Sequence, residues 1–94
     1  ANQARNVWSN VPKETDILVT HGPPYQVLDR TISGENVGDK ELYYAVSCLA
    51  PKLHVFGHTH ESYGIYQSST TTFINASVCN RDFEPVNSPL VFDL

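Results

Sequence analysis

Two short apolar runs, each followed by a histidine, constrain this chain more than any other feature of its sequence. The first run, 17–20, is followed by His21 and a Gly-Pro-Pro segment that cannot continue a β-ladder. The second run, 52–57, ends in a glycine and is followed by His58. Because the Ile-Leu-Val of the first run is continuous rather than alternating, we expect this strand to be buried on both faces, as in a parallel sheet.

The segment between the two runs predicts how they are connected. Residues 25–39 are polar and contain two glycines, which predicts a loop. Residues 39–51 then predict an amphipathic helix with Asp39 as its N-cap, Pro51 as its stop, and an apolar stripe formed by Leu42, Ala45, Val46 and Leu49. A strand, a loop, a helix and a second strand form a crossover unit, so we predict an α/β fold with both strands parallel.

The remainder of the chain predicts a hairpin and a closing strand. Residues 63–69 and 70–78 form the two arms of the expected hairpin, with its turn near 68–71, and 89–94 form the final strand. We expect a single domain over 1–94. Within it, 1–14 are a loosely attached lead-in, and 15–94 carry the strands, the main helix and the loops of the site.

Charge and composition limit the classes of partner. Ten acidic and six scattered basic residues give a net charge of −4, so no nucleic-acid footprint is visible and a bound phosphate would need a metal ion or a helix N-terminus. No apolar run approaches the ~20 residues of a membrane span. Cys48 and Cys79 are expected to be half-buried free thiols, which indicates a reducing compartment such as the cytoplasm.

The histidines carry the chemistry of the chain. Ligands of open α/β sheets bind beyond the carboxyl ends of the strands, where His21, His58 and His60 are expected to meet and where neutral imidazoles would suit zinc, manganese or iron. Taken alone, His21 is equally consistent with a capping or core residue. His54 lies mid-strand and is expected to be a core residue. Glycines beside the ligands, Gly22 among them, would allow the close backbone approach of such a site.

Three segments together resemble a known family. LVTHGPP, HVFGHTHESYG and TFINASVCN are similar to the C-terminal half of a calcineurin-like metallophosphoesterase, and most closely to the MPPED-type metallophosphodiesterases. The resemblance implies half of a four-layer α/β/β/α sandwich. It further implies a centre of two divalent ions (Mn, Fe, Zn or Mg), with His21 and His58 on one ion and His60 on the other. The implied reaction is hydrolysis of a small phosphoester, with a nucleotide-like phosphodiester as the substrate, by metal-activated water.

Other signatures of that family are missing from this chain. No Asp-x-His, Gly-Asp-x-x-Asp or Gly-Asn-His occurs, and three histidines are too few to hold two divalent ions. We therefore expect the catalytic residues to lie in a missing N-terminal segment, without which this chain is inactive. The expected partner is that complementary segment, or failing it a second copy of the chain, because half of the sandwich would leave an apolar sheet face bare.

Some roles stay open at the level of sequence. Gly22, Asn75 and Tyr63 are candidates to contact substrate, although a strand-end turn explains Asn75 and a core position explains Tyr63 equally well or better. One alternative function is a noncatalytic, metal-dependent nucleotide-binding or scaffold protein of the same fold. Another is a structural zinc site in which the three histidines and one further group complete a tetrahedron.

Overall fold

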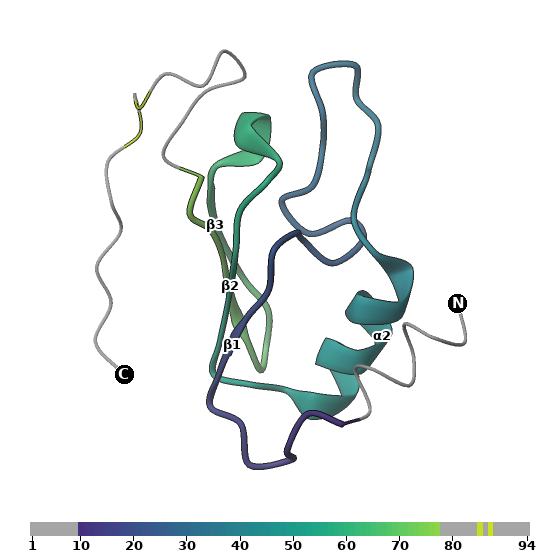
Figure 1. Ribbon diagram of the computed structural model, residues 1–94, viewed down its shortest axis with the longest axis vertical. Coiled ribbons are helices and arrows are strands. Elements are labelled where there is room, and N and C mark those ends of the chain that lie inside the picture. Colours follow the sequence, from purple (N-terminus) through teal and green to yellow (C-terminus); the bar gives the residue numbers. More distant parts are fainter. Residues whose placement is uncertain (1–9, 78–84, 86, 88–94) are drawn as a thin grey trace.

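The structure is a computed structural model that describes residues 10–77, 85 and 87 (Figure 1). Its elements in chain order are β1 (Ile17–Val19), α2 (Lys40–Leu49), β2 (Leu53–Phe56), the 3-10 helix η1 (His60–Ser62), β3 (Gly64–Gln67) and β4 (Thr72–Asn75). The strands form one sheet in the order β1-β2-β4-β3. The predicted α/β class is confirmed.

The pairing of the strands matches the predicted connections. β1 pairs with β2 in parallel, and β2 also pairs in parallel with β4. β3 and β4 form the predicted antiparallel hairpin, in which the Ser68 amide donates to the Thr71 carbonyl at 2.9 Å. Because β1 and β2 run in the same direction, their carboxyl ends lie side by side at one edge of the sheet, together with η1 and the loop that precedes α2 (Figure 1).

Helix α2 begins and ends where its sequence predicts. The Asp39 carboxylate accepts hydrogen bonds from the amides of Glu41 and Leu42, which satisfies two donors of the first turn. Ala50 ends the helix in the left-handed conformation with φ 51°, and its amide donates to the Val46 carbonyl. Leu42 and Val46, on the predicted apolar stripe, are buried against the sheet.

The two faces of the sheet have different surroundings. One face packs under α2, and the core there is formed by Val27, Leu42, Val46, Phe56 and Phe73. The other face carries Val19, which is 71% exposed, and Ile17 and Ile65, which are about half exposed. The prediction that the first strand is buried on both faces is therefore wrong. β1 lies at the edge of the sheet, and within the described residues no helix covers this second face.

The remaining expectations concern the cysteines, the two ends of the chain and membrane spans. Cys48 is a free thiol, as predicted, but it is exposed rather than half-buried, because it lies on the side of α2 that faces away from Leu42 and Val46. The lead-in to residue 9, Cys79 and the final strand 89–94 lie outside the described residues. No helix in the part of the chain that the structure describes is long and apolar enough to cross a membrane.

Candidate metal centre

His21 and His58 meet at the carboxyl edge of the sheet. Each lies two residues beyond the end of its strand, β1 or β2, and the parallel pairing brings the two loops together. The Gly57 amide donates to the His21 carbonyl at 3.1 Å, which fixes one backbone against the other. Both side chains are exposed, and their ring centroids are 4.7 Å apart.

The backbone at His58 is strained. Its φ is 70°, in the left-handed region that residues with a Cβ rarely adopt, and the Thr59 amide donates to the Gly57 carbonyl at 2.8 Å. A bond between residues two apart around a centre with positive φ defines the rare and strained form of the γ-turn. Such strain is concentrated at functional sites, where the surrounding structure maintains it. Here the turn places the imidazole of His58 beside that of His21.

The two imidazoles present nitrogen atoms to each other at a distance that suits either a hydrogen bond between the rings or chelation of one ion. His21 Nε2 and His58 Nδ1 are 3.2 Å apart. With Zn–N bonds of about 2.05 Å, two nitrogens in neighbouring tetrahedral positions are separated by about 3.4 Å. Imidazole nitrogens are ligands for zinc, manganese and iron alike. The donor atoms and their spacing therefore fit two ligands of one divalent ion.

His60 is not part of this pair. It is partly buried at the start of η1, one residue beyond Thr59. Among residues 10–77, 85 and 87, no three His, Cys, Asp or Glu side chains lie close enough to hold one ion. The tetrahedral zinc site expected as an alternative is therefore not assembled in this region. The assignment of His60 to a second ion stays a prediction.

His54 has a different environment from the other histidines, as predicted. It is fully buried, with its ring against those of Phe56 and Phe73 at centroid distances of 5.0 and 5.7 Å. Burial lowers the pKa of His54 from 6.5 to about 4, so the ring is neutral at physiological pH. His54 Nε2 lies 3.0 Å from the Thr20 hydroxyl, and Nδ1 has no hydrogen-bond partner in the described part of the chain.

Asn75 supports the loops of the site. It is fully buried, and its amide nitrogen donates to the carbonyls of Leu28 at 3.0 Å and Thr59 at 2.8 Å. Its carbonyl accepts from the Ser77 amide. These bonds join the loop before α2 to the turn that carries His58 and His60. Asn75 therefore holds two loops of the site together, whereas a contact between Asn75 and substrate stays a prediction.

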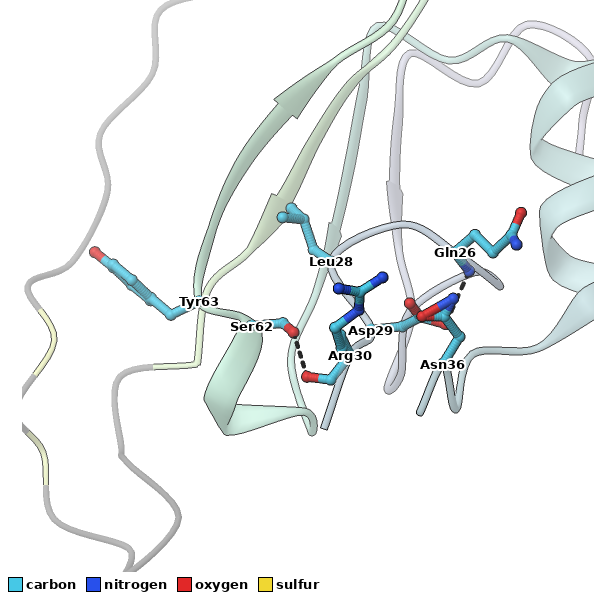
Figure 2. A pocket seen from close by; sticks show the side chains of 7 residues that line it. All are labelled: Gln26, Leu28, Asp29, Arg30, Asn36, Ser62 and Tyr63. Atoms are coloured by element: carbon cyan, nitrogen blue, oxygen red, sulfur yellow. Dashed lines mark hydrogen bonds between the residues drawn. The ribbon is translucent and has the colours of Figure 1, made fainter. Parts of the chain in front are cut away.

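A pocket of about 570 Å³ opens beside the end of η1 (Figure 2). The Ser62 hydroxyl donates to the Arg30 carbonyl at 2.6 Å, and this bond joins the two walls of the pocket. The Asp29 carboxylate is buried and accepts from the amides of Gln26 and Gly38, both at 2.8 Å. The lining residues are Gln26, Leu28, Asp29, Arg30, Asn36, Ser62 and Tyr63.

Two residues that line the pocket, Arg30 and Tyr63, differ in orientation and in charge. The Arg30 side chain is exposed, and its guanidinium makes no hydrogen bond or ion pair with any described residue. Tyr63 borders the pocket, but its ring points away from the other labelled side chains (Figure 2). Arg30 therefore provides a cationic group that can pair with an anionic ligand.

The glycines near the site differ in what a side chain at their positions would meet. A Cβ built at Gly22 would meet no atom within 4 Å, and one at Gly57 would lie 3.4 Å from the Ser77 hydroxyl. Neither glycine is required for a close approach between segments of the described structure, and the close approach of a bound ligand to them stays a prediction. The close approach occurs at Gly38, where a Cβ would lie 2.3 Å from the Pro24 carbonyl oxygen. A contact between Gly22 and substrate stays a prediction.

Thr20 and Arg30 had not been predicted as site residues. The only signal for Thr20 is its place between an apolar strand and His21, and Arg30 is one of several scattered cations. Their roles depend on contacts between segments far apart in sequence, 34 residues apart in the case of Thr20 and His54.

Comparison with known proteins extends the resemblance seen in the motifs. No protein-family model matches the chain. Metallophosphoesterase domain-containing protein 1 of Homo sapiens is 48% identical over 89 residues, which cover 93% of this chain and 27% of that protein. A UPF0046 protein of Caenorhabditis elegans is 39% identical over 98% of this chain and 31% of its own length. A probable rhamnogalacturonate lyase C of Emericella nidulans is 49% identical over 79 residues, only 7% of its length.

Two facts follow from these comparisons. The resemblance to MPPED-type metallophosphoesterases is confirmed, with nearly the whole chain matched. The chain nevertheless spans only 27% and 31% of the length of the first two relatives.

Proposed function

We propose that this chain, which resembles a segment of the MPPED-type metallophosphoesterases, supplies histidine ligands to a centre of divalent ions that hydrolyses phosphoesters. The observation that carries the proposal is the pairing of His21 Nε2 and His58 Nδ1 at 3.2 Å, with His58 in a strained turn at the carboxyl edge of the sheet. Similarity to a protein named for a metallophosphoesterase domain supports the same reaction class.

The histidines have defined tasks in this proposal. His21 and His58 hold one ion, and His60, at the start of η1, contributes to a second, so that the centre is binuclear. The ions, when bound, polarise the phosphoester and activate the attacking water. Mn, Fe, Zn and Mg all remain candidates.

The pocket beside η1 would hold the organic group of the substrate, for which we propose a small, nucleotide-like phosphodiester. Its position follows from Ser62, which lines it and lies two residues beyond His60. Arg30 would pair with an anionic oxygen of the ligand. The side-chain amides of Gln26 and Asn36 offer both hydrogen-bond donors and acceptors. Tyr63 at the border and Gly22 beside His21 remain candidates for further contacts.

The remaining ligands would come from a complementary segment. No three metal-ligating side chains converge in the described part of the chain, and the matched relatives are far longer than this chain. We propose that this segment provides carboxylate ligands and completes a four-layer sandwich against the exposed sheet face. The free thiol of Cys48 agrees with a reducing compartment, and we propose the cytoplasm.

A noncatalytic, metal-dependent nucleotide-binding protein is the second candidate. It is favoured by one observation: within residues 10–77, 85 and 87, no carboxylate joins the His21–His58 pair in a metal-binding group. Such a protein would use the same histidines and the same pocket without turnover.

The proposal is tested in two steps. Calorimetric titration of the chain with Zn²⁺ should show binding that His58→Ala weakens about 100-fold, whereas Lys52→Ala, exposed before β2, should leave it unchanged. A polypeptide carrying both this chain and the complementary segment should then hydrolyse bis(4-nitrophenyl) phosphate in Mn²⁺, again dependent on His58. Zinc binding that does not depend on His58 would overturn the metal assignment. Binding that depends on His58, without hydrolysis, would favour the noncatalytic candidate.

A further inference from the structure

A chain of hydrogen bonds connects the buried core to the loop that carries His21. The Thr20 hydroxyl, at the end of β1, donates to the Gly22 carbonyl at 2.8 Å and lies 3.0 Å from His54 Nε2. Thr20 and Gly22 are the two sequence neighbours of His21. The chain therefore runs from a fully buried ring on β2 to the residues on both sides of the proposed ligand.

The direction of each bond follows from the single hydroxyl proton of Thr20. Because that proton is donated to the Gly22 carbonyl, the hydroxyl oxygen can only accept from His54. His54 must then carry its proton on Nε2, and Nδ1 is unprotonated. This tautomer agrees with the buried Nδ1, which has no hydrogen-bond partner among the described residues.

The backbone around His21 is held from two directions. On one side the Thr20 amide donates to the Val55 carbonyl at 3.0 Å, and the Thr20 hydroxyl donates to the Gly22 carbonyl. On the other side the Gly57 amide donates to the His21 carbonyl. With both neighbours and its own carbonyl fixed, the direction in which the His21 side chain leaves the backbone is set. Rotation about its side-chain bonds is the freedom that remains to the ring.

We propose that His54 is a positioning residue, which acts through the Thr20 hydroxyl to fix the backbone at Gly22 and so aims the His21 imidazole at His58. This inference rests on the proposed function, since it assigns His54 to the support of that metal centre. Outer residues that orient ligands in this way typically change metal affinity 10- to 100-fold when they are replaced.

A purely structural role does not explain His54 equally well. Its ring packs against two phenylalanines in an apolar core, where a leucine would bury no polar atom, whereas His54 buries an Nδ1 that has no partner among the described residues. The single hydrogen bond that its ring makes in the described structure is the one to Thr20. Burial also keeps the ring neutral, so the direction of that bond does not change across the physiological pH range.

The test separates positioning from stability. Thr20→Val removes the hydroxyl and leaves the His54 donor unpaired, whereas Thr20→Ser retains the hydroxyl as a matched control. The double variant Thr20→Val with His54→Leu removes both polar partners, so the folded state should regain stability while the link to Gly22 stays broken. Zn²⁺ affinity is measured by calorimetry and stability by urea denaturation.

If His54 acts through Thr20, Zn²⁺ affinity should fall about tenfold in Thr20→Val, in His54→Leu and in the double variant, and it should stay at the wild-type value in Thr20→Ser. Wild-type affinity in His54→Leu, or in the stable double variant, would overturn the proposal. Nuclear Overhauser contacts between the His21 and His58 rings provide a metal-free readout, and they should weaken in the same three variants. If the wild-type chain binds no Zn²⁺, the proposed function fails, and these contacts alone decide the positioning role. Unchanged contacts would overturn it.

Discussion

His54 and the His21–His58 pair place the same side chain in opposite surroundings. His54 lies within β2 and faces α2, so its ring is sealed between Phe56 and Phe73, neutral and in one tautomer. His21 and His58 lie two residues beyond their strands and are exposed, with nitrogens that face each other. Position relative to the end of a strand, rather than residue type, therefore decides whether a histidine supports the core or is available to a ligand.

The largest expected difference is in stability. His54→Ala should lower the free energy of unfolding by about 3 to 4 kcal/mol, because it opens a cavity between two aromatic rings and removes the bond to Thr20. His58→Ala should change it by less than about 0.5 kcal/mol, since that ring is exposed. Urea denaturation followed by circular dichroism measures both. Similar losses in the two variants would remove the distinction between the sites.

The pH dependence should show a slightly smaller effect. In the unfolded chain His54 protonates near pH 6.5, whereas burial delays this to about pH 4 in the fold. Between these values the unfolded state binds more protons, so the free energy of unfolding falls as the pH is lowered, by up to about 3 kcal/mol. His54→Gln should lack this component. The difference between the two stability curves, measured from pH 7 to pH 4, isolates it, and parallel curves would show that His54 does not contribute.

The smallest effect concerns the strained turn. His58→Gly should be more stable than His58→Ala by about 1 to 2 kcal/mol, because glycine adopts φ 70° without steric conflict at its Cβ. Ala50→Gly, at the left-handed end of α2, should show a similar gain without any effect on Zn²⁺ binding. Thermal denaturation measures both. An alanine variant at 58 as stable as the glycine variant would indicate that the backbone there is relaxed.

Local patterns predicted most of the fold. The parallel crossover, the cap of α2 by Asp39 and the hairpin turn depend on residues near one another in sequence, and all three are confirmed. The exposure of Val19 could not be predicted, because a continuous apolar run is the same whether its strand is central or at an edge.

The site was predicted less completely. The convergence of His21 and His58 follows from two parallel strands ending at one edge, and the pattern predicted it. The positive φ of His58 could not be predicted, since a Gly-His dipeptide suggests that the glycine takes the unusual conformation. The hydrogen bond between His54 and Thr20 could not be predicted either, because it joins side chains from segments far apart in sequence.

The side-chain amide of Asn75 connects the two parts of the site, the pocket beside η1 and the His21–His58 pair. By bonding to the carbonyls of Leu28 and Thr59 it joins one wall of the pocket to the turn of His58. A molecule that stiffens the pocket would therefore reduce the entropy lost when the histidines take up an ion, without any contact between the two. By reciprocity, an ion at the histidines would raise the affinity of the pocket by the same factor, so under the proposed function occupancy of the two places would be thermodynamically linked.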